Sequence, residues 1–109
     1  MKILYWNIRS LNNPLKVKIL SKKIKRTNPA IIFIQETKFP AAQIEDLSKK
    51  MWKGSDGIGI DAKCYAGGLG ILWDPTKVTL GGFHGTGCAL LVEFRVHPWS
   101  WVTLFGKAL

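Results

Sequence analysis

Two short polar segments, each directly after an apolar run, carry the side chains best suited to chemistry. The first includes Asn7, Arg9 and Asn12, and the second includes Glu36 and Lys38. A carboxylate that ends a buried strand is costly unless it is ionised against a cation, and Mg²⁺ prefers oxygen ligands with bound waters. Amide and cationic side chains can hydrogen-bond phosphate. The two segments therefore indicate a site for a divalent cation and a phosphate group.

The elements that flank these segments are expected to bring them together. The apolar run over residues 3–8 predicts a buried strand, and the continuous run over residues 30–34 predicts a strand covered on both faces. A helical pattern between them makes a parallel βαβ unit, whose strands end at the same edge of the sheet. Ligands collect at that edge in parallel sheets. Asn7 and Glu36 should then face one pocket.

The segment between the two strands predicts a basic amphipathic helix. Asn13 and Pro14 are typical of a helix start, because the Asn side chain can accept a free backbone N–H and Pro has none to lose. Apolar residues recur at helical spacing, and lysines with one arginine fill the other faces. The expected packed face consists of Leu15, Ile19, Leu20 and Ile24.

The remainder of the chain predicts a second helix and then a β-rich region. The helix is expected to start at Pro40, and after Lys53 many glycines break the sequence into short segments. Strands are expected over residues 68–73, 77–83, 88–96 and 101–105, with turns at Asp74-Pro75 and His97-Pro98. The 109 residues suit one small α+β domain.

The charge of the chain is strongly and unevenly positive. The formal net charge is +9, and only Lys77, Arg95 and Lys107 lie beyond Lys63. Such a surplus favours polyanions through the release of condensed counterions, so nucleic acid or an anionic membrane surface is the natural partner class. We expect DNA or RNA and no membrane. Lys22 and Lys23 are candidate phosphate contacts of the basic helix, and a merely solvated helix face is the alternative.

Cysteine content and hydropathy predict the compartment. Cys64 and Cys88 lack the spacing of a zinc or redox motif, so both are expected to be free thiols. The apolar start of the chain is too short for a signal peptide, and no stretch approaches the length of a membrane span. We expect a soluble intracellular protein, with the nucleus as one candidate compartment.

The two polar segments also carry a family resemblance. Trp6-Asn7-Ile8-Arg9 with Leu11-Asn12, and Gln35-Glu36-Thr37-Lys38, resemble the first and second motifs of the endonuclease/exonuclease/phosphatase superfamily, which includes deoxyribonuclease-I-like enzymes. With Asn12-Asn13-Pro14 before a basic helix and the segment Gly67-Gly68-Leu69-Gly70-Ile71-Leu72-Trp73, the pattern is most similar to the N-terminal part of plant non-LTR retrotransposon endonuclease domains. The resemblance spans nearly the entire chain.

The resemblance implies a fold, an activity and roles for several residues. The implied fold is a four-layer αββα sandwich, of which residues 1–109 supply a partial, N-terminal portion. The implied ancestral activity is DNA phosphodiester hydrolysis with Mg²⁺ or Mn²⁺. Glu36 matches the family's metal ligand, and Asn7 matches the asparagine that hydrogen-bonds the active-site assembly and the phosphate. Arg9, Asn12 and Lys38 are candidate nucleic-acid contacts, although Asn7 and Asn12 could also be turn residues that bond their own backbone.

The sequence departs from the family pattern downstream. The family's Tyr, its Asp-x-Asn pair and its Ser-Asp-His segment are absent from these 109 residues, and neither His84 nor His97 lies in a Ser-Asp-His context. Hydrolysis also requires a base to activate water, which Glu36 alone does not supply. We expect a truncated domain that is inactive alone and that self-associates through an exposed sheet face.

Two other functions remain open at this stage. One is a non-catalytic basic module that binds nucleic acid through the helix around Lys16 to Arg26 and ignores Mg²⁺. The other is a phosphomonoesterase or lipid phosphodiesterase on the same fold, which the basic charge favours less because that charge suits a polymeric anion.

Overall fold

The computed structural model describes residues 1–60, 68–86, 89–97 and 100–107. The two cysteines expected to be free thiols, Cys64 and Cys88, lie outside the described residues, as does Pro98 of one expected turn. The elements, in chain order, are β1 (Ile3–Asn7), α1 (Pro14–Thr27), β2 (Ile31–Gln35), η1 (Ala41–Gln43), α2 (Ile44–Met51), β3 (Asp56–Ile60), β4 (Leu69–Trp73), β5 (Val78–Thr86), β6 (Ala89–Val96) and β7 (Ser100–Lys107).

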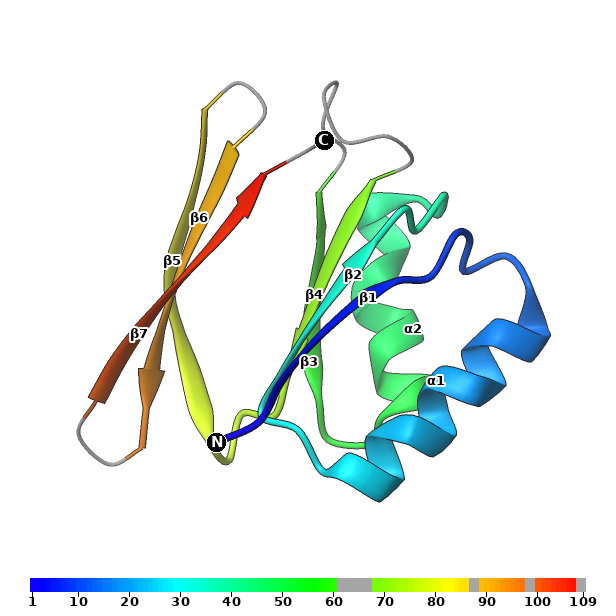
Figure 1. Cartoon of the computed structure of the whole chain (residues 1–109), viewed down its shortest axis with the longest axis horizontal. Coiled ribbons are helices and arrows are strands. Elements are labelled where there is room, and N and C mark those ends of the chain that lie inside the picture. The colour runs from blue at the N-terminus through cyan, green and yellow to red at the C-terminus, as the bar shows by residue number, and fades with distance from the viewer. Residues whose placement is uncertain (61–67, 87–88, 98–99, 108–109) are drawn as a thin grey trace.

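The described strands form two sheets, and the helices cover one of them (Figure 1). The first sheet has the order β1-β2-β4-β3, and the second has the order β5-β6-β7. Strands β1 and β2 are parallel neighbours, as the βαβ prediction required, and the other described pairings are antiparallel. The fold is therefore α+β, with one helical layer and two sheets among the described residues. Along these residues no helix is long and apolar enough to span a membrane.

Helix α1 begins and ends as the sequence predicts, but it packs through a different face. The Asn13 side chain accepts the Leu15 N–H at 3.0 Å, and Asn28 ends the helix in the left-handed conformation. Leu20 is buried, whereas Leu15 is 64% exposed and Ile19 is 47% exposed. The prediction of a face containing Leu15 and Ile19 was wrong. The packed face turns toward Val17 instead, which packs against the buried cluster that contains Leu20 and Ile24.

Strand β3 was not predicted, because two of its five residues are glycines. The structure explains them by close packing against the second helical segment and, at Gly57, also against Leu72 of β4. A methyl group at Gly59 would lie 2.5 Å from Ile44 and 2.6 Å from the backbone of Ala41, and one at Gly57 would lie 2.9 Å from the Ser48 hydroxyl. Glycine is therefore selected here for close packing and not for turn formation.

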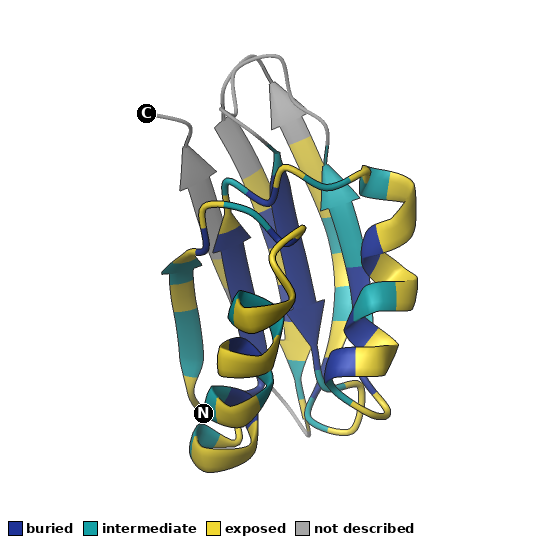
Figure 2. Cartoon of the chain, turned by 90° about the vertical axis from the view of Figure 1, so that its right-hand side faces the viewer, coloured by how far each residue is buried: buried dark blue, intermediate teal, exposed yellow. Residues whose placement is uncertain are grey.

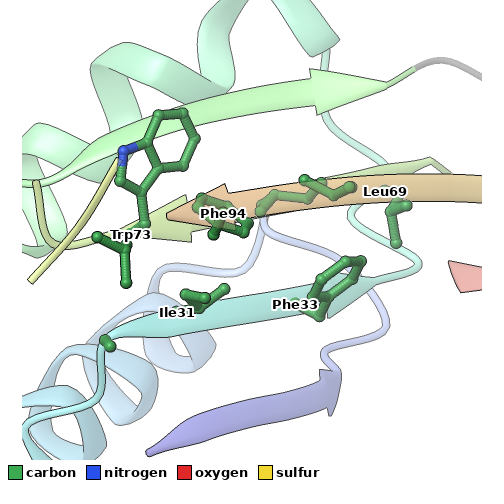
Figure 3. Close-up of a cluster of buried hydrophobic side chains, with 9 residues drawn as sticks. Ile31, Phe33, Leu69, Trp73 and Phe94 are labelled. Carbon is green, nitrogen blue, oxygen red and sulfur yellow. The ribbon is translucent and has the colours of Figure 1, made fainter. Parts of the chain in front are cut away.

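The main core lies between the two sheets. Ile31 and Phe33 of β2 and Trp73 of β4 pack against Phe94 of β6, and the Trp73 and Phe94 rings meet edge to face at a centroid distance of 5.6 Å (Figure 3). Strand β6 alternates as predicted, with Val92 and Phe94 buried and Glu93 and Arg95 exposed. A second core lies under the helices, whose outward faces are exposed (Figure 2). Strand β2 is thus covered on both sides, and its end is held firmly in place.

Candidate metal and phosphate site

Two loops leave the sheet side by side and carry four of the predicted site residues, and a fifth, Asn7, ends the strand before the first loop. Asn7, the last residue of β1, is the register partner of Gln35, the last residue of β2. We call residues 8–12 the first motif loop and residues 36–38 the second motif loop. Because β1 and β2 are parallel, both loops start at the same edge of the sheet (Figure 1). The structure therefore brings Asn7, Arg9 and Asn12 beside the segment that carries Glu36 and Lys38.

Backbone hydrogen bonds continue between the loops beyond the strands. The Ile8 N–H donates to the Gln35 carbonyl at 3.1 Å, and the Leu11 N–H donates to the Thr37 carbonyl at 2.7 Å. These bonds satisfy polar backbone groups that the strands no longer pair. They also fix Glu36 from both sides, since the residue before it and the residue after it are each tied to the first motif loop.

The same loops hold several side-chain-bearing residues in positive-φ backbone conformations. Arg9 has φ 57°, Ser10 has φ 128°, Glu36 has φ 53° and Lys38 has φ 46°. Such conformations cost an L-residue on the order of 1 kcal/mol or more, and they persist where the surrounding structure enforces them. Asn28 is the other described non-glycine residue with positive φ, and asparagine tolerates it at a helix end. The strain is thus concentrated in the two motif loops.

The charged side chains of the loops are left available. Arg9 and Lys38 are exposed, Glu36 is half-buried and Asn7 is exposed. None of these four side chains makes a hydrogen bond or ion pair with another residue that the structure describes. One carboxylate, one amide and two cations therefore surround this edge without neutralising each other. Such a set can bind a cation and a phosphate together.

Asn12 is already used within the site. Its side-chain Nδ2 donates to the Lys38 carbonyl at 2.6 Å, and its backbone N–H donates to the Ser10 hydroxyl at 3.2 Å. The amide group therefore joins the two motif loops to each other. Its predicted role as a nucleic-acid contact would require the remaining amide oxygen.

The structure does not bring Lys22 and Lys23 to the motif loops. The Lys23 ammonium lies 5.3 Å from the centre of the Trp6 ring, in cation–π geometry. Trp6 faces the helices, and the residue that follows it in the strand, Asn7, points to the opposite face. Lys22 is exposed on the outer side of α1. A phosphate track through these lysines would run over the helical layer.

Three residues of the site were missed by reasoning from the sequence. Lys16, in the first turn of α1, donates from Nζ to the Arg9 carbonyl at 3.3 Å and adds a cation beside the first loop. Thr37 is buried, and its N–H donates to the Gly68 carbonyl at 3.4 Å. A methyl group at Gly68 would lie 2.9 Å from the Thr37 hydroxyl oxygen, so Gly68 makes room for the second loop. The double glycine before β4 was the available signal.

A divalent cation fits this edge in part. Glu36 supplies one carboxylate, and Mg²⁺ is commonly held by one or two carboxylates with several waters. Nowhere in the described ranges do three His, Cys, Asp or Glu side chains gather to hold a metal. The cation would therefore depend on the Glu36 carboxylate and on water, with the Asn7 amide beside it.

The other end of the same two strands contains a groove of about 540 Å³. Lys2 and Ala30, which precede β1 and β2, line it together with Lys77 and His97. His97 bonds the Thr79 hydroxyl at 2.7 Å and the Thr76 carbonyl at 3.2 Å. None of the predicted site residues lines this groove, and His97 is too far along the sheets to act at the motif loops.

Comparison with known families defines the class of protein. A family model described as the endonuclease/exonuclease/phosphatase family matches residues 4–106. The chain belongs to this family. A comparison with curated proteins gives no match.

Solved structures agree with this assignment at the level of the fold. D. rerio TDP2 complexed with a single-strand DNA product has a TM-score of 0.70 at 18% identity, over 94% of this chain and 43% of that chain. A mannosyl-6-phosphatase from Bacteroides thetaiotaomicron has a TM-score of 0.70 at 14% identity, over 94% and 49%. An endonuclease/exonuclease/phosphatase from Bacteroides vulgatus has a TM-score of 0.68 at 19% identity, over 93% and 49%. The chain thus spans less than half the length of each.

Proposed function

We propose that the two motif loops form the first part of a divalent-metal-dependent nuclease site that acts on DNA. One observation carries the proposal: Glu36 and Asn7 leave neighbouring parallel strands at one edge, on a backbone that is bonded on both sides of Glu36. Preorganised charge of this kind is what phosphoryl chemistry requires. The structure of D. rerio TDP2 with a single-strand DNA product supports DNA as the substrate class.

Each side chain has a distinct proposed role. Glu36 would hold Mg²⁺ or Mn²⁺, and the Asn7 amide would hydrogen-bond the phosphate. Arg9 and Lys38, both exposed beside them, would bind neighbouring phosphates of the strand. When bound, the cation would offset the negative charge that develops on the phosphate.

The proposal separates binding from turnover. Within these 109 residues the family's Tyr, Asp-x-Asn and Ser-Asp-His parts are lacking, so we expect the chain alone to bind metal and DNA without cleaving DNA. The similarity of its motifs to plant non-LTR retrotransposon endonucleases makes an origin in such an element, and a nuclear location, part of this proposal. A fluorescent fusion expressed in plant cells would test the location.

Metal titration is the direct test of the site. Mn²⁺ binding is measured by electron paramagnetic resonance for the wild-type chain, for Glu36→Gln and for the control Glu45→Gln. Glu45 is an exposed carboxylate on α2 that pairs with Lys49 at 3.2 Å. We expect Glu36→Gln to weaken Mn²⁺ binding by about 100-fold or more, since Glu36 is the carboxylate of the proposed site among the described residues, and Glu45→Gln to leave it unchanged. Equal affinities in all three proteins would reject the site.

A plasmid assay tests the expected lack of turnover. Supercoiled plasmid is incubated with the chain and Mg²⁺, and nicked product is quantified. We expect no nicking above buffer. Nicking that disappears in Glu36→Gln would contradict the inactivity of these residues while supporting the metal site.

A second candidate function rests on helix α1 alone. Lys18, Lys22, Lys25 and Arg26 are all exposed on this helix. A metal-independent nucleic-acid module would bind through them, and its affinity would fall steeply with salt but not with loss of Glu36. Comparing Lys22→Ala with Glu36→Gln in a salt titration with and without Mg²⁺ separates the two functions.

A phosphomonoesterase is the third candidate, because the mannosyl-6-phosphatase structure matches as well as the TDP2 complex does. Competition for bound DNA by mannose 6-phosphate would favour it.

Self-association is also proposed. Tyr5 is 60% exposed and Phe83 is 53% exposed, although both are large and aromatic. Sedimentation velocity at rising concentration should show dimers, and a monomer at all concentrations would exclude them.

A further inference from the structure

We propose that Asn12 is a positioning residue that locks the two motif loops together and thereby sets the place of the Glu36 carboxylate. The inference rests on the proposed function for the metal itself, but the lock can be measured without any metal. It assigns to Asn12 a role other than that of a nucleic-acid contact.

The bond made by Asn12 is the outermost of a short series. The first is Ile8 N–H to Gln35 carbonyl at 3.1 Å, the second is Leu11 N–H to Thr37 carbonyl at 2.7 Å, and the third is Asn12 Nδ2 to Lys38 carbonyl at 2.6 Å. The first two use backbone donors and the third uses a side chain. Among the described residues it is the bond that ties Lys38 to the first motif loop.

An amide side chain suits this position for a physical reason. Lys38 has φ 46°, so β2 no longer continues and its carbonyl has no strand partner. The side-chain donor of Asn12 reaches across to it from the first loop, and the Asn12 backbone N–H is bonded to the Ser10 hydroxyl within that loop. Aspartate has the same size as asparagine but offers only acceptors when ionised, so it would repel the Lys38 carbonyl.

Glu36 lies between the first two bonds of this series, and its φ of 53° is enforced by its surroundings. Loss of the third bond removes the tie between Lys38 and the first motif loop, so the adjoining Leu11–Thr37 bond should open more often and hold Glu36 in place less strictly. A metal ligand must stay within about 0.5 Å of its productive position. A larger displacement of the Glu36 carboxylate would therefore weaken metal binding. Residues that orient metal ligands typically contribute about tenfold or more in affinity.

Asn13 provides a matched control at the next position. It is also an asparagine, and its side chain also makes one hydrogen bond to a backbone group, but that bond caps α1 at Leu15 and does not reach the second loop. Asn12→Ala, Asn12→Asp and Asn13→Ala can therefore be compared in the full chain. All three remove one side-chain hydrogen bond, and only the first two remove the lock.

The first readout is hydrogen exchange of the Leu11 amide, which donates to Thr37. We expect faster exchange in Asn12→Ala and faster still in Asn12→Asp, with no change in Asn13→Ala and no change at the buried Ile32 amide in any variant. Leu11 exchange that is equal in all proteins would overturn the lock, whatever the metal does.

The second readout is Mn²⁺ affinity. We expect a loss of about tenfold in Asn12→Ala and none in Asn13→Ala. Faster Leu11 exchange with unchanged Mn²⁺ affinity would overturn the positioning role. If Glu36→Gln leaves Mn²⁺ binding unchanged, the proposed metal function is wrong. The Leu11 exchange rate does not depend on metal, so it still tests whether Asn12 locks the loops.

Discussion

The two ends of the β1–β2 pair use polar residues in opposite ways. At the amino end, Lys77 donates to the Asn28 side chain at 2.9 Å and to its carbonyl at 3.1 Å, and lies 3.9 Å from the Asp74 carboxylate. The side chains there satisfy each other. At the carboxyl end, backbone groups are bonded across the two motif loops, while the side chains of Asn7, Arg9, Glu36 and Lys38 have no hydrogen-bond or ion-pair partner among the described residues.

This difference separates a structural end from a binding end of one sheet. A polar group whose partners are already present contributes to stability, and it has little left to offer a ligand. A charged group that is held in place without a partner contributes little to stability, and it can bind a ligand at small reorganisation cost. Changes at the amino end should therefore alter unfolding alone, and changes at the carboxyl end should alter metal or DNA binding.

The largest effect is expected from Gly68→Ala, because Gly68 packs against Thr37 of the second motif loop. Gly68 has φ 93°, and a methyl group would lie 2.9 Å from the Thr37 hydroxyl oxygen. Backbone strain and the close contact together should lower the free energy of unfolding by about 2 kcal/mol. Gly82→Ala is the control, because a methyl group there meets no atom within 4 Å. Urea unfolding measures both, and equal midpoints would refute the proposed crowding.

Lys77→Met should affect only stability. The substitution keeps the aliphatic length but removes the ammonium that bonds Asn28 and faces Asp74. We expect a loss of roughly 1 kcal/mol after allowance for partial exposure, with Mn²⁺ affinity unchanged. Lys2→Met is the control, since Lys2 is exposed near the same end. A weaker Mn²⁺ affinity in Lys77→Met would break the separation of the two ends.

Arg9→Ala and Lys38→Ala should affect only DNA binding. Both side chains are exposed at the carboxyl end, so unfolding should change by less than about 0.5 kcal/mol. If each contacts one phosphate, the slope of log affinity against log salt should fall by about one for each substitution. Fluorescence anisotropy with labelled single-stranded DNA gives the slope. Lys2→Ala removes the same charge at the amino end, and an equal change in slope there would mean that binding is not localised.

From the sequence we could predict the strands other than β3, the parallel pairing of β1 with β2, and the placement of Asn7 beside the Glu36 segment. The reason is that two apolar runs joined by a capped helix are compatible with few chain topologies. It did not allow β3 to be predicted, since Gly57 and Gly59 are explained only by the residues that pack closely against them in the folded chain. The exposed Leu15 and Ile19 were assigned to the core because periodicity alone does not fix which part of an apolar stripe meets the sheet. The Asn12 bond to Lys38 was missed because the two residues are 26 positions apart.

Placing glycine at one left-handed residue of each end should change stability in opposite directions. Lys38→Gly removes the conformational strain of a side-chain-bearing residue at φ 46°. The free energy gained should exceed the entropic cost that glycine adds by making the unfolded chain more flexible, so we expect a stabilisation of about 0.5 kcal/mol. Asn28→Gly relieves little, because asparagine tolerates φ 48°, and it removes an acceptor of Lys77, so we expect a loss of about 1 kcal/mol. Denaturant midpoints measured side by side give both signs. Stabilisation at both residues would mean that the amino end is as strained as the carboxyl end, and the distinction between a structural and a binding end would then lose its energetic basis.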